Sequence, residues 1–233
     1  GCDLRRSRGC AVVPLRPWLT IEPMSATQET LVRAPRPGAE TLAEPMRSRW
    51  SPAVFATDIP VGDDEIASML TAAVWAPSTG NTQPWAFVVT RAGTAAYDAV
   101  VATLSNGNSG WVPTAPVVIV GAALVGEWEG RKGMGDYALY DLGQSVAHLT
   151  LQAQAIGLHS HQFAGFDHEA AAAALGIPGA YRPMVGIAVG RLGGDEHVAR
   201  AAEGDVARHT KDRTRRGASE VGYDGAWGTP FAG

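Results

Sequence analysis

Apolar residues recur at helical spacing in the segment that follows residue 62. Acidic residues occupy the expected first turn, where they complement the positive end of the helix dipole. Pro77 is expected to end this helix because a proline disfavours helical geometry in the residue before it. The apolar members, spaced i, i+3, i+4, i+7 and i+8 as on one helix face, are Ile66, Met69, Leu70, Ala73 and Val74.

Short apolar runs alternate with further helical patterns along the rest of the chain. The run from 115 to 126 is too short to cross a bilayer and predicts a buried strand instead. Strands that alternate with helices predict a sheet covered by helices on its faces. We expect strands near 86–90, 117–123, 158–163 and 184–189, and helices near 97–104, 136–156 and 167–175.

The two ends of the chain differ from this central pattern. Residues 1–45 contain several prolines and no sustained apolar periodicity, which predicts a flexible N-terminal extension. Met24 is a plausible start, so residues 1–23 are expected to be a translational or cloning-derived addition. Residues 46–190 are expected to form the core. Residues 191–233 lack a periodic core but end in aromatic residues, which predicts an arm that wraps a second subunit.

Composition narrows the function classes. The 233 residues are 45% hydrophobic and 18% charged, with a net charge of −4, which is ordinary for a globular protein. This balance argues against binding to nucleic acid or to an anionic membrane. The two cysteines, Cys2 and Cys10, both lie near the N-terminus and cannot crosslink the core, so a cytoplasmic location is expected.

Two polar segments flank the first predicted helix, one before it and one after it. Arg49 and Ser51 place a guanidinium and a hydroxyl close together, which suits a phosphate, although a solvated loop is the commoner explanation for such a tripeptide. In the stretch from Pro77 to Trp85 a helix stops and a strand starts among many hydroxyl and amide side chains. That density of donors favours a binding loop about equally with a polar turn.

Two further segments lie later in the chain. Gly165, between Ala164 and Phe166, would allow a planar ligand to approach the backbone closely, and a tight turn is the simpler alternative. Arg213 to Arg216 form a basic cluster in an acidic protein. Such a cluster is usually a solvated face, but it could also close a phosphate site from a second direction.

Taken in order, these segments resemble the nitroreductase family of FMN flavoproteins across about residues 45 to 228. The resemblance implies an α+β fold of three layers around a central, mainly antiparallel sheet. It also implies a domain-exchanged homodimer with two FMN sites at the subunit interface. The matching elements are Arg49-Trp50-Ser51-Pro52, Ala76-Pro77-Ser78-X-X-Asn81-X-Gln83-Pro84-Trp85, Gly165-Phe166-Asp167 and Arg213-X-Arg215.

The resemblance also implies roles for single residues. FMN phosphate contacts would come from Arg49, Ser51, Arg213 and Arg215, with backbone contacts from Trp50. The partner subunit would bring Pro77, Ser78, Thr79 and Asn81 to the same flavin. Gly165, preceded by Ala164, would place a backbone N–H near flavin N5, and Asn108 (or Asn106) would bind the pyrimidine edge. Ala53 departs from the family because a basic residue is common there, and some members carry an acidic residue at the position of Ala164.

The implied activity is ping-pong hydride transfer from NAD(P)H to a small electron-poor acceptor such as a nitroaromatic or a quinone. Two alternatives remain: an FMN-dependent dehydrogenase or oxidase of a peptide or ring, and a non-catalytic flavin-binding dimer. His159 and His161 could face one way on a strand as a metal pair, but no third ligand is evident and no metal is expected. The segment 126–135 is either a mobile lid or a plain exposed loop.

Overall fold

The computed structural model describes residues 38–232 of the chain. The expectation that residues 1–23 are an addition lies outside the described residues. So does most of the expected N-terminal extension over 1–45, of which residues 38–45 form turns.

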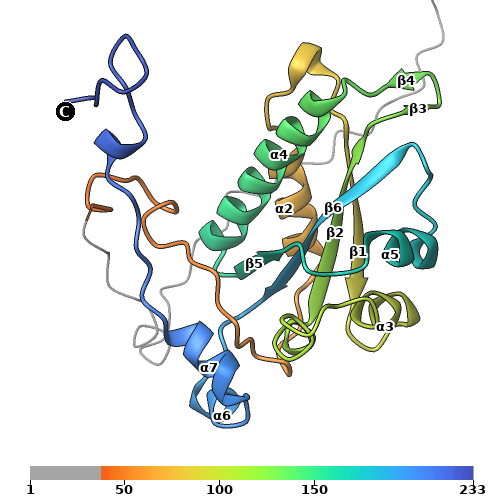
Figure 1. Cartoon of the computed structure of the whole chain (residues 1–233). Coiled ribbons are helices and arrows are strands. Elements are labelled where there is room, and N and C mark those ends of the chain that lie inside the picture. The colour runs from red at the N-terminus through yellow and green to blue at the C-terminus, as the bar shows by residue number, and fades with distance from the viewer. Residues whose placement is uncertain (1–37, 233) are drawn as a thin grey trace, which may run out of the picture.

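The centre of the molecule is a four-stranded sheet (Figure 1). Its strands are β1 (Trp85–Arg91), β2 (Val117–Leu124), β5 (His159–Phe163) and β6 (Tyr181–Gly190), in the order β1-β2-β6-β5. Every neighbouring pair is antiparallel, which confirms the expected sheet type. A separate two-stranded hairpin is formed by β3 (Glu127–Trp128) and β4 (Arg131–Lys132).

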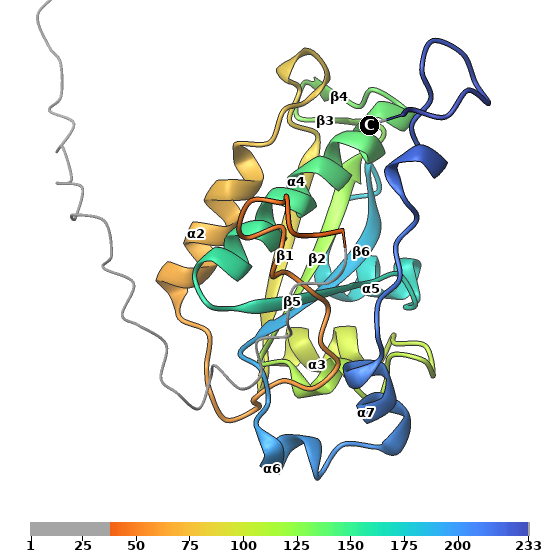
Figure 2. The ribbon, with the colours of Figure 1, turned by 90° about the vertical axis from the view of Figure 1, so that its left-hand side faces the viewer.

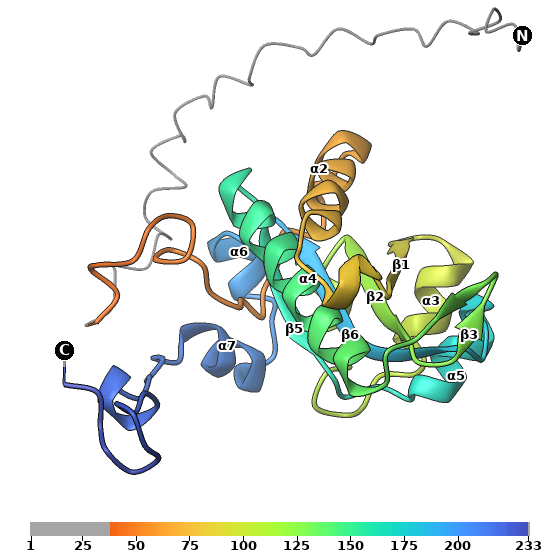
Figure 3. The ribbon, with the colours of Figure 1, turned by 90° about the horizontal axis from the view of Figure 1, so that it is seen from above.

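Helices cover both faces of the sheet. One face carries α2 (Asp63–Val74) and α4 (Asp136–Ala155), and the other carries α3 (Ala95–Val101) and α5 (His168–Leu175), as Figure 3 shows from above. The fold is therefore the expected three-layer α+β arrangement.

Strand β2 lies in the middle of these layers. Val117 and Ile119 pack into the cluster under α2 and α4, whereas Val118 and Val120 pack into the cluster under α3 and α5. Successive side chains of a strand point to opposite faces, so a strand covered on both sides must be apolar at every position. This explains why the sequence here is a continuous apolar run.

Helix α4 spans the molecule from the hairpin to the start of β5. At 1.5 Å per residue its 20 residues extend about 30 Å. Ser145 Oγ donates a 2.9 Å hydrogen bond to the carbonyl of Ala73, which ties α4 to α2 in the core. Two segments held at opposite ends of this helix are therefore well separated in one subunit.

The tail leaves the sheet after β6 and forms α6 (Asp195–Val198), α7 (Glu203–Thr210) and a short helix η3 (Ala218–Glu220). Beyond α7 it runs as an extended arm beside the core (Figure 2). Trp227 in this arm is 89% exposed, and Tyr223 and Phe231 are also exposed. No helix within residues 38–232 is long and apolar enough to cross a membrane.

Candidate functional site

The segment 49–51 has no regular secondary structure, and its position is set by side-chain contacts. Trp50 is buried, and its ring meets those of His209 and His159 edge-on, at centroid distances of 4.9 and 6.2 Å. Arg49 Nη1 lies 3.5 Å from Ser51 Oγ. The buried tryptophan thus anchors the segment, while the two flanking polar side chains lie together.

The tail brings two more arginines to this segment. Arg213 Nη2 donates a 2.8 Å hydrogen bond to the carbonyl of Arg49. Burial lowers the pKa of the Arg49 guanidinium, and the positive charge of Arg215 lowers that pKa further. A partly buried cation close to a like charge is stabilised by an anion. We call Arg49, Ser51, Arg213 and Arg215 the arginine cluster.

A second predicted pair, Asn108 and Gly165, is also brought together. Asn108 Nδ2 donates to the Gly165 carbonyl at 2.9 Å, and Asn108 Oδ1 accepts from Trp111 Nε1 at 3.1 Å. A Cβ on Gly165 would lie 2.5 Å from Ser105 Oγ and 2.6 Å from Asn108 Nδ2, so any larger residue would displace these two side chains. Ala164, the other predicted residue of this turn, is exposed beside it.

The turn and the arginine cluster are physically connected. Trp111 stacks on His161, with the ring centroids 4.0 Å apart and the planes 22° from parallel. His161 Nδ1 lies 2.7 Å from the carbonyl of Pro52 and must carry a hydrogen there, since a carbonyl only accepts. Contacts therefore run from Gly165 through Asn108, Trp111 and His161 to Pro52, beside Ser51. We call the arginine cluster together with this turn the first half-site.

Residues 77–85, which we call the motif loop, connect α2 to β1. The backbone N–H of Thr79 donates to Asp141 Oδ2 on α4 at 2.9 Å. Ser78 Oγ accepts from the Gln83 N–H at 3.0 Å, and Asn81 Oδ1 accepts from Gln83 Nε2 at 3.2 Å. Its first residue, Pro77, is exposed. The bonds to Gln83 fix the loop internally, and the bond to Asp141 fixes it to α4.

The backbone of the motif loop is unusual. Asn81 and Gln83 adopt φ angles of 55° and 46°, in the left-handed region, and Gly80 adopts 57°. Residues other than glycine rarely adopt positive φ, and such residues gather at functional sites where surrounding contacts hold them. The contacts of Asp141 and Gln83 provide that support.

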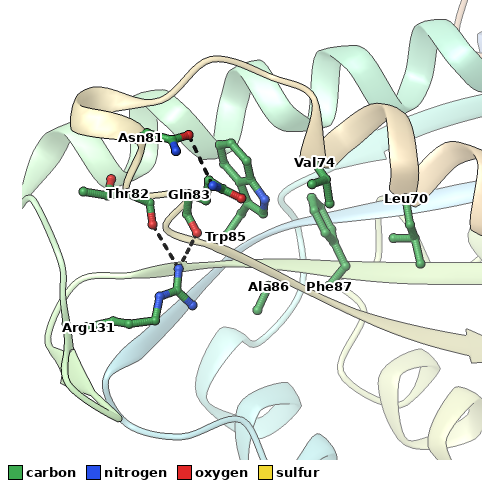
Figure 4. A pocket seen from close by; sticks show the side chains of 9 residues that line it. All are labelled: Leu70, Val74, Asn81, Thr82, Gln83, Trp85, Ala86, Phe87 and Arg131. Carbon is green, nitrogen blue, oxygen red and sulfur yellow. Dashed lines mark hydrogen bonds between the residues drawn. The ribbon is translucent and has the colours of Figure 1, made fainter. Parts of the chain in front are cut away.

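The β3–β4 hairpin, which corresponds to the segment considered as a lid, is attached to the motif loop. Arg131 Nη2 donates to the carbonyls of Thr82 and Gln83, at 3.0 and 2.5 Å (Figure 4). A pocket of about 590 Å³ opens beside them. Its polar side carries the loop and Arg131, and its apolar side belongs to α2 and β1. The lining residues are Leu70, Val74, Asn81, Thr82, Gln83, Trp85, Ala86, Phe87 and Arg131.

The motif loop and the first half-site lie apart within one subunit. The loop is held at Asp141, near the start of α4, whereas Trp50 packs on His159, just beyond its end. The 14 helical steps from residue 141 to residue 155 span about 20 Å at 1.5 Å per step. Figures 1 and 2 show the turn between α2 and β1 at one end of the molecule and α7 at the other.

Sequence reasoning missed two residues that organise these regions. Asp141 is buried on the apolar face of α4. A carboxylate among the apolar positions of a helical pattern is unusual, and this could have marked the residue in the sequence. His209 is buried in the tail, where no periodic pattern marks it. Its Nδ1 accepts hydrogen bonds from the N–H groups of Ala53 and Val54, at 3.3 and 3.1 Å.

The two histidines considered as a metal pair make other contacts. His161 stacks on Trp111, and burial lowers the pKa of His159 to about 4. Within residues 38–232 there is no group of three or more His, Cys, Asp or Glu side chains that could hold a metal ion.

Fold and site together define the class of protein. It is a three-layer α+β protein in which an arginine cluster lies beside a glycine turn. The model of the nitroreductase family matches residues 46–191. The chain belongs to the nitroreductase family, and it is an oxidoreductase.

The chain is also similar to individual proteins and solved structures. A protein of Mycolicibacterium smegmatis, described as an uncharacterized 15.4 kDa protein in the ask 5′ region, is 35% identical over 135 residues, which are 58% of this chain and 86% of that protein. A solved oxidoreductase containing FMN is 27% identical, with a TM-score of 0.69 over 78% of this chain and 90% of its own. A nitroreductase family protein from Streptococcus pneumoniae is 22% identical, with a TM-score of 0.60 over 76% and 96%.

Proposed function

We propose that the protein is an FMN-dependent oxidoreductase that transfers a hydride from NAD(P)H to a small electron-poor acceptor, such as a nitroaromatic or a quinone. The observation that carries the proposal is the arginine cluster. Arg49 and Arg215 are close enough for one positive charge to lower the pKa of the other, and the backbone carbonyl of Arg49 holds Arg213 beside them. A phosphate dianion suits such a set of donors.

The residues present fit the rest of FMN as well. Because Gly165 has no side chain, Ser105 and Asn108 pack directly against its backbone, and two hydrogen bonds fix Asn108 there. In the proposal, Arg49, Ser51, Arg213 and Arg215 hold the phosphate, and the turn at Ala164 and Gly165 meets the ring. When bound, FMN supplies the hydride chemistry, so the protein needs no acid–base pair of its own.

The proposed active form is a homodimer. The motif loop, with Pro77, Ser78, Thr79 and Asn81, and the segment that carries Arg49 and Ser51 are anchored about 20 Å apart along α4, which favours a flavin contacted by the two regions from different subunits. The exposed aromatic residues of the arm, Trp227 above all, suit burial against a second copy. Each site would then combine the first half-site of one subunit with the motif loop of the other.

Purification in the presence of FMN tests the proposal. The expected product is a yellow dimer that NADH or NADPH bleaches under anaerobic conditions and that a nitroaromatic or quinone re-oxidises. A protein that binds no FMN would contradict the proposal. Bleaching only by a peptide or cyclic amine would favour the dehydrogenase alternative, and binding without bleaching by any donor would favour the non-catalytic dimer.

A further inference from the structure

We infer that His209 is a positioning residue for the phosphate end of the cofactor site, an inference that rests on the proposed function. His209 lies in the last turn of α7 and is only 5% exposed. His209 belongs to the tail, and its ring contacts the segment that carries Arg49 and Ser51. Its role would be to set the position of the tail arginines relative to that segment.

The chemical state of the ring follows from its partners. Backbone N–H groups can only donate, so Nδ1 accepts from both Ala53 and Val54 and carries no hydrogen. The indole of Trp50 meets the same imidazole edge-on at 4.9 Å. The ring therefore acts as an acceptor for two consecutive amides of a buried segment.

Two contacts from one stretch of the tail hold one stretch of the core. His209 holds the backbone at residues 53 and 54, and Arg213, four residues later, holds the carbonyl of Arg49 at 2.8 Å. Ser51 lies between these two contact points, in the stretch from residue 49 to residue 53. A shift of the tail would therefore change the spacing of Arg49, Ser51 and Arg213 together, and phosphate binding depends on that spacing.

The nature of residue 53 strengthens the inference. The resemblance to the family leads one to expect a basic side chain there, but Ala53 is 0% exposed. The cations beside the segment come instead from the tail, at Arg213 and Arg215. Because the tail supplies these charges, whatever fixes the tail to residues 53 and 54 also fixes the charges.

The test compares FMN with riboflavin, which lacks the phosphate, in the full-length dimer. His209→Leu removes the acceptor, and we expect its FMN dissociation constant to rise about tenfold while that for riboflavin stays within about twofold. His209→Asn places an oxygen close to the position of Nδ1 and should recover most of the FMN affinity. His209→Gln carries its oxygen one atom further out and should behave like the leucine variant.

His197→Leu is the matched control. His197 also docks the tail, through Nε2 to Asp58 Oδ1 at 2.8 Å, but away from the arginine cluster. Its loss should lower the melting temperature without changing the ratio of the two dissociation constants.

Three results would overturn the inference: equal weakening of both flavins by His209→Leu, no weakening of either, or equal behaviour of the Asn and Gln variants. If the leucine variant does not fold, the Asn and Gln pair decides. A wild-type protein that binds neither flavin would instead contradict the proposed function itself.

Discussion

The first half-site and the motif loop are stabilised in opposite ways. In the motif loop, side chains of the protein already accept the hydrogen bonds of the backbone: Asp141 accepts from the Thr79 N–H, and Ser78 accepts from the Gln83 N–H. In the first half-site, by contrast, Arg49 and Arg215 bring like charges near one another. The loop is thus preformed, whereas the arginine cluster gains most from an added anion.

This difference predicts which part of the cofactor each region controls. A region in which positive side chains lie close together should determine affinity for the phosphate. A region whose polar groups already have hydrogen-bond partners should act through its shape. Changes there should therefore alter the affinities for phosphorylated and unphosphorylated flavin equally.

Replacing both Arg213 and Arg215 by alanine should weaken FMN binding most. Each charged hydrogen bond contributes roughly 1.5–3 kcal/mol, so we expect the FMN dissociation constant to rise at least about 100-fold. Riboflavin binding should change little. Fluorescence titration of both flavins measures this, with Arg182→Ala, an exposed arginine on β6, as the control for net charge. Unchanged FMN retention in the double variant would refute the phosphate role of the tail.

Asp141→Ala should damage the motif loop. The change leaves the Thr79 N–H without its buried acceptor, which costs about 1–3 kcal/mol in the free energy of unfolding. FMN and riboflavin should weaken by similar factors because the effect is on the shape of the loop. Asp141→Asn, which keeps an acceptor oxygen, serves as the control. If Asp141→Ala weakened FMN binding but not riboflavin binding, the two regions would not differ in the part of the cofactor that they control.

The buried contact between His159 and Trp50, beside the arginine cluster, should be acid-sensitive. Burial lowers the pKa of His159 to about 4. The unfolded chain therefore takes up the proton first, and the contribution to stability is full above about pH 6.5 and is lost as the pH falls toward 4.

For His159 alone, the free energy of unfolding should be about 2 kcal/mol lower at pH 5 than at pH 7. Urea titrations at the two pH values measure the difference. The His159→Gln variant should show a smaller difference between them. An equal difference in the wild type and the variant would mean that other groups cause the acid sensitivity.

Arg131→Ala should have the smallest effect. Arg131 is exposed and binds the carbonyls of Thr82 and Gln83 from the hairpin side, so its removal should cost less than about 1 kcal/mol of stability. Hydrogen exchange in residues 126–135 should nevertheless become faster, because the hairpin loses its link to the loop. Unchanged exchange in that segment would show that the hairpin is held by other contacts.

Much of the fold could be predicted from local pattern. The apolar run of β2 and the helical spacing of α4 each depend on neighbouring residues alone, and both elements lie where the pattern placed them. The order of the strands could not be found in this way, because pairing of β2 with β6 joins segments some 65 residues apart. The family resemblance supplied the mainly antiparallel sheet.

The candidate site divides along the same line. Residue type and order point to Arg49, Ser51, Gly165 and Arg213, and the family resemblance implies Asn108 (or Asn106). The structure brings Asn108 and the other four into one connected region. The roles of Asp141 and His209 depend on contacts with residues 62 and 155 or 156 positions away. No local sequence signal specifies such contacts, although a buried aspartate on an apolar helix face could have raised the question.

The most direct test of a site shared between subunits is complementation. One variant carries alanine at Arg213 and Arg215, and the other carries alanine at Ser78 and Asn81. Each homodimer alone should bind FMN weakly. When the two variants are co-expressed, a mixed dimer would contain one site with both intact regions, so tight FMN binding should reappear in about a quarter of the sites. If no tight sites appear in the mixed dimers, both regions do not act on one flavin from different subunits.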